Sequence, residues 1–165
     1  MSWYELRKDD GESLREKGLL WKTRDKAIRR TRRLRNNERA LVDLIQSLDT
    51  QYEGLIVIVE GKRDEQVLRN LGLKAPIIKT QSGMPREQFL RSLVEEIGDG
   101  HVLILTDFDD EGKELCSFIE REFELRRVKI LRRLRREFRK AMGNWRCIED
   151  LVSLFKRKDS PEPAI

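Results

Sequence analysis

The sequence has few of the residues from which disulfide frameworks and zinc sites are built. It contains two cysteines, Cys116 and Cys147, and one histidine, His101, with no CxxC or Cys/His spacing. Isolated cysteines of this kind are reduced thiols by default, and a structural zinc site needs four ligands. The composition therefore excludes a disulfide-stabilised secreted domain and a zinc-ribbon or zinc-finger domain.

Long apolar runs are also missing. No stretch of 18 apolar residues exists, and the first residues, MSWYELRKDD, lack the apolar segment of a signal peptide. We therefore expect a soluble, cytoplasmic protein without membrane contact. A chain of 165 residues is long enough for a self-sufficient core, although 39% charged residues imply large solvated faces.

Two apolar segments that are present run directly into carboxylates. The first is LIVIVEGKRD, residues 55–64, and the second is VLILTDFDDEG, residues 102–112. Both are apolar on two faces, which is typical of parallel strands covered by helices on either side. Ligands bind beyond the carboxyl ends of such strands, so Glu60, Asp107 and Asp109 are the candidate site residues.

The charge of these carboxylates predicts a metal. On neighbouring strands they would lie close together, and like charges at close range disfavour joint ionisation unless a cation intervenes. Magnesium prefers carboxylate oxygens and keeps water or phosphate in its remaining positions. We therefore predict Mg²⁺, with Mn²⁺ as the alternative, and phosphate chemistry. Gly61 and Lys62 open the following helix, where backbone amides and an ammonium group are placed to meet a phosphate.

Helix and strand patterns alternate along the rest of the chain, which predicts an α/β fold. Strands are expected at residues 55–59, 76–79, 102–105 and 128–131, with helices over 62–71, 85–97 and from about 111 to 123. We divide the chain into an N-terminal arm with a basic amphipathic helix (1–50), a four-stranded parallel domain that ends in a basic helix (51–155) and a disordered tail (156–165). A last helix is expected near residues 147–155 within that domain.

Two segments concentrate the basic residues. Residues 22–39, expected to be helical, carry nine basic against two acidic side chains, and residues 126–140 carry nine against one. Such runs are typical of a solvated helix face, and also of a surface that binds a phosphate backbone. The residues expected to contact nucleic acid are Arg29, Arg30, Arg32, Arg33, Arg132, Arg133, Arg135 and Arg136. Trp3, Tyr4 and Trp21 in the arm favour packing on the domain or on a second subunit, so a homodimer is compatible with the sequence.

The residues EGKRD and, some forty positions later, TDFDDEG resemble the TOPRIM domain. That domain is shared by bacterial-type primases, topoisomerases, OLD-type nucleases and the small ribonuclease that matures 5S ribosomal RNA. The resemblance covers roughly residues 54–151, and the size is similar to the small stand-alone, primase-like TOPRIM proteins of archaea. It implies a Rossmann-like parallel sheet with the first and third strands adjacent, Glu60 as general acid or base, and Asp107 and Asp109 as magnesium ligands. Glu111 matches a third acidic, metal-binding position that topoisomerases have and the maturation ribonuclease lacks, which leaves the subfamily open.

These observations predict magnesium-dependent phosphodiester or phosphoryl-transfer chemistry on nucleic acid, with RNA favoured over DNA. A nuclease is the first choice and a nucleotidyl transferase the second. A topoisomerase needs a transesterifying tyrosine on large gate domains, whereas the chain has only Tyr4 and Tyr52. The alternative from another class is a non-catalytic RNA-, DNA- or nucleotide-binding module, for example one associated with the ribosome.

Overall fold

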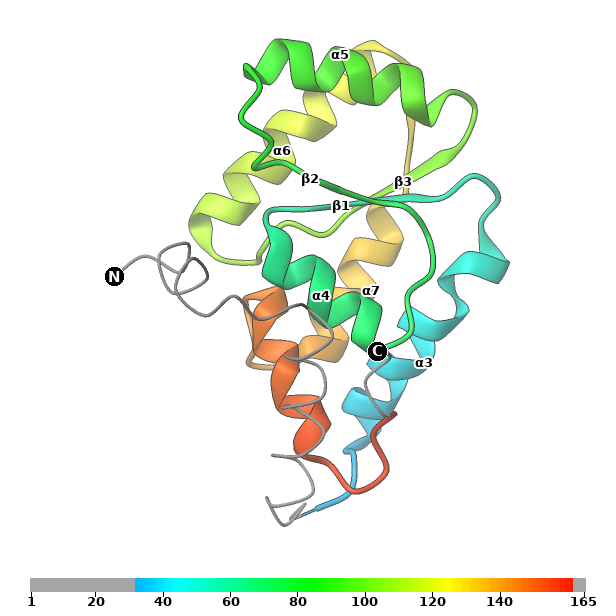
Figure 1. Cartoon of the computed structure of the whole chain (residues 1–165), viewed down its shortest axis with the longest axis vertical. Helices are drawn as coiled ribbons and strands as arrows, with labels where there is room; N and C mark the ends of the chain where they lie inside the picture. Colours follow the sequence, from blue (N-terminus) through cyan, green and yellow to red (C-terminus); the bar gives the residue numbers. More distant parts are fainter. Residues whose placement is uncertain (1–31, 162–165) are drawn as a thin grey trace, which may run out of the picture.

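The computed structural model describes residues 32–161, and a sheet of four parallel strands lies at their centre (Figure 1). The strands are β1 (Ile56–Val59), β2 (Ile77–Lys79), β3 (His101–Ile104) and β4 (Lys129–Ile130), in the order β2-β1-β3-β4. Ile58 of β1 stands opposite Ile78 of β2 and Ile104 of β3. This arrangement confirms the predicted four-stranded parallel sheet and the adjacency of the first and third strands.

Helices cover both faces of the sheet. They are α3 (Asn36–Gln51), α4 (Lys62–Asn70), α5 (Arg86–Ile97), α6 (Asp110–Leu125), α7 (Arg132–Met142) and the 3₁₀ helix η1 (Ile148–Lys156). Figure 1 shows α5 and α6 above the sheet and α3, α4, α7 and η1 below it. None of the helices within residues 32–161 combines the length and the apolar character needed to cross a bilayer.

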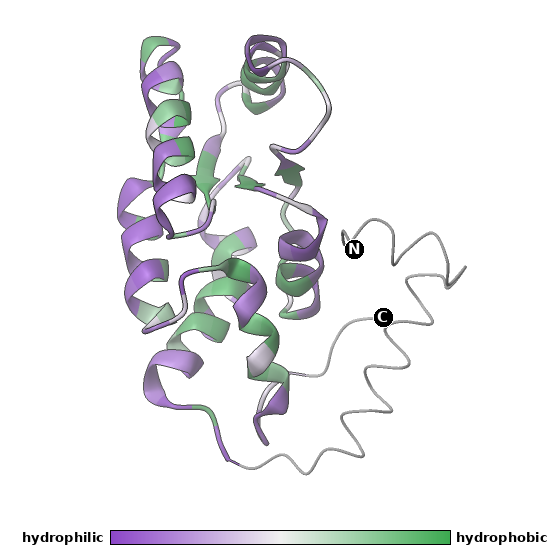
Figure 2. Cartoon of the chain, turned by 90° about the vertical axis from the view of Figure 1, so that its left-hand side faces the viewer, coloured by the Kyte–Doolittle hydropathy of each residue, from purple (hydrophilic) through white to green (hydrophobic). Residues whose placement is uncertain are grey.

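The apolar run of β1 serves two cores at once. Val57 and Val59 pack with α3, α4, α7 and η1, whereas Ile56 and Ile58 pack with α5 and α6. Successive side chains of a strand point to opposite faces, so a strand that is covered on both sides must be apolar at every position. Figure 2 shows the same layering, with hydrophobic strands between helices that are hydrophilic on the outside.

The described part of the first basic segment is not helical before Asn36. Residues 32–35 are extended, and α3 begins where the Glu38 side chain accepts a hydrogen bond from the Arg35 N–H at 2.9 Å. This contact satisfies one of the amide groups that a helix start leaves unpaired, so the helix starts here rather than upstream. Residues 22–31, which we expected to be helical, and with them Arg29 and Arg30, lie outside the described residues.

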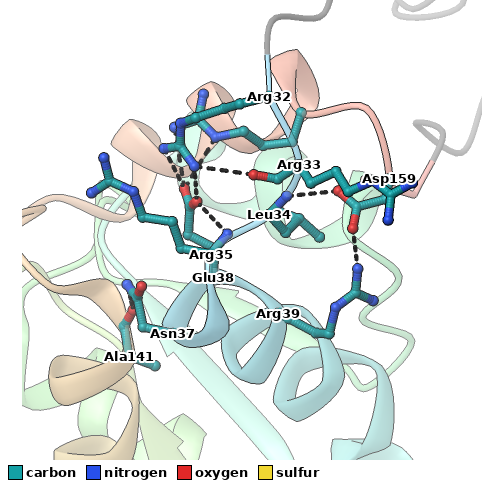
Figure 3. Close-up of polar contacts among 10 residues, drawn as sticks. Arg32, Arg33, Leu34, Arg35, Asn37, Glu38, Arg39, Ala141 and Asp159 are labelled. Carbon is teal, nitrogen blue, oxygen red and sulfur yellow. Dashed lines mark hydrogen bonds and ion pairs between the residues drawn. The ribbon is translucent and has the colours of Figure 1, made fainter.

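The segment after η1, which falls within the predicted tail of residues 156–165, contacts the start of α3. The Lys158 N–H donates to the carbonyl of Arg32 at 2.9 Å, and the Asp159 carboxylate accepts from the Leu34 N–H at 2.7 Å and pairs with Arg39. Figure 3 shows the contacts of Asp159 at the start of α3. A composition argument does not register pairing with residues that lie far away in the sequence, so the predicted tail did not include these contacts.

A buried carboxylate holds this corner together. Glu38 is 2% exposed and accepts hydrogen bonds from both Arg32 (2.7 Å) and Arg157 (3.2 Å), besides the one from the Arg35 amide (Figure 3). Burial alone would raise the pKa of Glu38, but these donors outweigh burial and lower that pKa to about 2. Arg32 and Arg157 come from opposite ends of the described chain, so Glu38 joins the two ends.

We predict that Glu38→Gln costs about 3–5 kcal/mol of unfolding free energy at neutral pH, because it leaves two cationic side chains without their buried partner. A pKa lowered on folding stabilises the protein above the unfolded value of about 4.5, and this gain is lost as the pH falls through about 2. The deficit of the variant measured by urea denaturation should therefore shrink in acid. Glu137→Gln, which breaks an exposed pair with Arg133 at 3.6 Å, is the control and should cost less than about 0.5 kcal/mol. Equal costs in the two variants would contradict the buried pairing.

Candidate functional site

The candidate site lies at the carboxyl ends of β1 and β3, where the chain leaves the sheet in opposite directions. After β1 it enters α4 on one face, and after β3 it enters α6 on the other. Such a switch in direction leaves a crevice beyond the strand ends. The Leu105 N–H donates to the carbonyl of Ile58 at 2.7 Å, so pairing continues past β3 and brings the two strand ends level. Glu60 and Asp107 follow directly from these ends.

The carboxyl groups of Glu60 and Asp107 come close enough there for each to affect the pKa of the other. Burial, followed by the negative charge of Asp107, raises the pKa of Glu60 to about 7. Burial also raises the pKa of Asp107; the hydrogen bond from the Ile148 N–H opposes this rise, and the charge of Asp109 adds to it. The structure thus brings together the strand-end carboxylates, as expected if their strands are neighbours.

A further carboxylate, Asp64, belongs to this cluster although the sequence analysis did not single it out. It lies in the first turn of α4, is 6% exposed and accepts a hydrogen bond from the Gly61 N–H at 3.1 Å. Burial, followed by the charge of Asp107, raises the pKa of Asp64 to about 6. The sequence does contain a pattern that indicates this contact, because an acidic residue three positions after a helix N-cap commonly accepts a hydrogen bond from the N-cap amide. Gly61 and Lys62 were predicted to bind phosphate. The Gly61 N–H already donates to Asp64, so of these two residues only the exposed Lys62 is available to a phosphate.

Asp109 is held at the start of α6 by a local cap. Its Oδ1 accepts a hydrogen bond from the Gly112 N–H at 2.8 Å, and the Thr106 hydroxyl donates to the Gly112 carbonyl at 2.7 Å. A Cβ atom on Gly112 would overlap the Asp107 carbonyl, so only glycine allows the helix to approach the loop this closely. The loop Asp107–Asp109 is therefore rigidly placed by the residues that follow it.

The segment that leads into η1 packs along the same loop. The Phe108 N–H donates to the Arg146 carbonyl at 2.6 Å, and the Ile148 N–H donates to Asp107 Oδ1 at 2.9 Å. Between these two bonds, the Cys147 thiol points at Asp109 Oδ2 across 4.0 Å. The sequence alone does not connect this segment to the site, because no local pattern reports a contact between residues about forty positions apart.

Arg135 of α7 lies beneath the cluster, and its guanidinium group donates hydrogen bonds to backbone carbonyls of the same chain. Its guanidinium donates to the carbonyls of Ile104 and Thr106, both at 2.9 Å, and to that of Asp107 at 3.4 Å. It also stacks on the ring of Phe108, 4.3 Å from the centroid. Burial lowers the pKa of Arg135, and nearby acidic groups including Glu60 oppose this. We predicted that Arg135 contacts nucleic acid; its donors are instead used to fix the strand end that carries Asp107.

The other described arginines that were predicted to contact nucleic acid are either paired with a carboxylate or exposed. Arg32 is committed to Glu38, and Arg132 pairs with Glu120 at 3.5 Å and with Glu124. Arg33 and Arg136 are exposed, and among the described residues no ion pair of Arg136 is found. Arg133 is also exposed, and its one ion pair among these residues is the loose contact with Glu137. The exposed basic face of α7 thus centres on Arg133 and Arg136.

A cavity of about 890 Å³ opens beside Glu60, between the end of β2, α5 and α6. Glu60 and the exposed Glu111 both line it, so Glu111 faces this space rather than joining the cluster of Asp107 and Asp109. Arg86 also lines it, with its guanidinium 5.1 Å from the centroid of the Phe118 ring. A volume of this size accommodates a nucleotide-sized ligand.

The group best arranged to hold a metal ion within residues 32–161 consists of Asp107, Asp109 and Cys147. Each offers a ligand atom within 4.8 Å of the other two. The two carboxylates suit magnesium or manganese, with Glu60 beside Asp107 as a further oxygen donor. Burial, followed by the charge of Asp107, raises the pKa of Cys147 to about 12, so without a cation the sulfur is a protonated thiol, 4.0 Å from Asp109 Oδ2. The oxygen donors present therefore fit the predicted cation.

Comparison with known proteins gives several related sequences of one family. A UPF0292 protein of Thermococcus onnurineus is 38% identical over 120 residues, which cover 72% of this chain and 86% of that protein. A UPF0292 protein of Methanocaldococcus jannaschii is 34% identical over 122 residues, which cover 72% of this chain and 91% of that protein. No family model matches the chain.

A solved structure supports the fold alone. A putative protein from Aquifex aeolicus superposes with a TM-score of 0.54 at 21% identity, over 66% of this chain and 94% of that one. The sequence relatives carry the assignment, since each matches at more than 30% identity over most of its own length. The chain belongs to the UPF0292 family.

Proposed function

We propose that this protein is a metal-dependent enzyme of phosphodiester or phosphoryl transfer on nucleic acid, a TOPRIM-type nuclease with RNA as its preferred substrate. One observation carries the proposal: Glu60, Asp64 and Asp107 converge at a switch point, and burial together with neighbouring negative charges raises the pKa of each of them. The nearby cation, Arg135, uses its donors on backbone carbonyls. A divalent cation is the group that relieves this repulsion.

In this proposal the residues have distinct roles. Asp107 and Asp109 hold Mg²⁺ or Mn²⁺, which when bound stabilises the negative charge that develops on a phosphate. Glu60, with a pKa of about 7, gives or takes a proton near neutral pH, where a general acid or base is most effective. Asp64 fixes the start of α4 behind Glu60 through the Gly61 amide.

The cavity and the basic face supply the substrate contacts. Arg86, Lys113 and Arg121 line the cavity that Glu60 enters, so a phosphate chain there meets cations on its way to the carboxylates. Phe118, under Arg86, offers an aromatic surface on which a base can stack. Arg133 and Arg136 extend the positive charge along α7, and Lys and Arg contacts of this kind provide salt-dependent affinity for a phosphate backbone.

Cleavage of RNA tests the proposal directly. With labelled structured RNA and either Mg²⁺ or Mn²⁺, Glu60→Gln and the double variant Asp107→Asn/Asp109→Asn should each lower the cleavage rate by about 100-fold or more, the size of a general acid–base contribution. Asp99→Asn changes an exposed carboxylate before the amino end of β3 and should keep the wild-type rate. Salt-dependent binding without cleavage in the wild type would favour the non-catalytic binding module instead.

Thermal stability tests the cation. A carboxyl group whose pKa is raised on folding stabilises the protein below its unfolded value, and the gain is lost as pH rises through the folded value. For Glu60 the two values are 4.5 and about 7, and for Asp64 they are 3.8 and about 6, so metal-free protein should lose stability between roughly pH 4 and pH 7.

Melting curves in EDTA should therefore show Glu60→Gln more stable than wild type at pH 8 but not at pH 4, with Tm rising by about 2–4 °C for each kcal/mol of repulsion removed. Mg²⁺ or Mn²⁺ should raise the Tm of the wild type at pH 8, and do so far less after Asp107→Asn/Asp109→Asn. An identical Tm for wild type and Glu60→Gln at both pH values, together with no response to cations, would contradict the cluster as a metal site.

Salt dependence tests the basic face. Arg133→Gln/Arg136→Gln should weaken RNA binding and reduce the slope of log affinity against log salt concentration by about 0.7 for each phosphate that the variant no longer neutralises. Arg132→Gln is the matched control on the same helix, and its effect should be smaller because Glu120 and Glu124 already neutralise that side chain. If Arg132→Gln changed the slope as much as the double variant does, the ion pairs with Glu120 and Glu124 would not explain which arginines bind RNA.

A further inference from the structure

The two cysteines of this chain occupy opposite environments. Cys116 is 5% exposed and lies in the apolar cluster of α5 and α6, where a thiol behaves as a small apolar side chain. Cys147 is partly exposed, and its sulfur points at the carboxylate of Asp109. The charges that act most strongly on this sulfur are those of Asp107, Asp150, Asp109 and Glu149. Packing accounts for Cys116, but an apolar core does not account for Cys147.

The backbone fixes the Cys147 sulfur in this position. Its neighbours in the sequence are bonded to the loop that carries the aspartates, Arg146 through the Phe108 N–H at 2.6 Å and Ile148 through Asp107 Oδ1 at 2.9 Å. The Cys147 N–H in turn donates to Asp150 at 3.3 Å, which caps η1. The sulfur is thus carried on a segment that is anchored on both sides of it.

The distances suit a shared cation. The sulfur lies 4.0 Å from Asp109 Oδ2, and ligand atoms of Asp107, Asp109 and Cys147 all lie within 4.8 Å of one another. An ion about 2.0–2.3 Å from each of its oxygen and sulfur ligands holds those ligands roughly 3–4.5 Å apart. Only small movements of these side chains are needed to enclose an ion.

We infer that Cys147 is a third protein ligand of the cation held by Asp107 and Asp109, and that the site binds a divalent transition-metal ion more tightly than Mg²⁺. This inference rests on the proposed metal site. Magnesium takes oxygen ligands, whereas a thiolate favours the softer transition-metal ions. On coordination the thiol releases its proton to the solvent and binds as a thiolate.

Cobalt titration of the full-length protein tests the inference, because a sulfur ligand gives Co²⁺ a near-ultraviolet charge-transfer band that oxygen ligands do not give. The wild type and Cys116→Ala should both show the band. Cys147→Ser should lose it and bind Co²⁺ more weakly, by at least the roughly 10-fold that losing even an outer partner costs a metal site. In competition, Mn²⁺ should displace Co²⁺ at lower concentrations than Mg²⁺ does.

The results that would contradict the inference can be told apart from those that would contradict the proposed metal site. Saturable Co²⁺ binding without the band, abolished by Asp107→Asn/Asp109→Asn, would overturn the role of Cys147 and leave the proposed metal site standing. A band that survives that double variant would also overturn the inference, since the sulfur would then bind cobalt elsewhere. No saturable binding of Co²⁺, Mn²⁺ or Mg²⁺ would overturn both. If circular dichroism shows that Cys147→Ser does not fold, Cys116→Ala, which keeps Cys147 as its one thiol, decides the question.

Discussion

Parallel pairing of β1 and β3 brings negatively charged side chains close together, and the surrounding elements supply hydrogen-bond donors that hold these side chains in place. The strand ends place Glu60 against Asp107, and α4 adds Asp64. The compensation comes from hydrogen-bond donors rather than from free cations: the Ile148 amide serves Asp107, and the Gly112 amide serves Asp109. Backbone donors fix the carboxylates in place without neutralising them, so the cluster keeps the negative charge that attracts a divalent cation.

The elements of the fold could be predicted from the sequence because their patterns are local, whereas the adjacency of the first and third strands was implied by the resemblance to the TOPRIM domain. A strand covered on both faces must be apolar at every position, and β1 and β3 are nearly so; their order in the sheet then brings Glu60 to Asp107. The helix stripes and the glycine that ends α5 are equally local. Asp64 was within reach of the same reasoning, because a helix cap depends on residues only three positions apart.

The roles of the arginines could not be read from their spacing. Arg135 and Arg136 are adjacent and chemically identical, yet one is folded under the loop of Asp107 and the other is exposed. Helical rotation separates neighbours by about 100°, so a run of basic residues necessarily points in several directions. The way α7 packs on β3 decides which of these side chains contact backbone carbonyls and which are exposed to water. That packing depends on contacts between residues far apart in the sequence. Charge density alone therefore does not tell which arginines of such a run are exposed.

The 3₁₀ helix η1 links the acidic cluster to the distant corner at Glu38. At its start, the Ile148 amide is bonded to Asp107, and just after its end Arg157 is bonded to Glu38. Between these points Leu151, Leu154 and Phe155 are buried in the core shared with α3 and α4. A segment pinned at both ends and buried along its length has little freedom to shift, so the amide at Asp107 and the sulfur at Asp109 keep their positions. The 3₁₀ helix η1, which the sequence predicts only as a last helix near residues 147–155, is in this way part of the site.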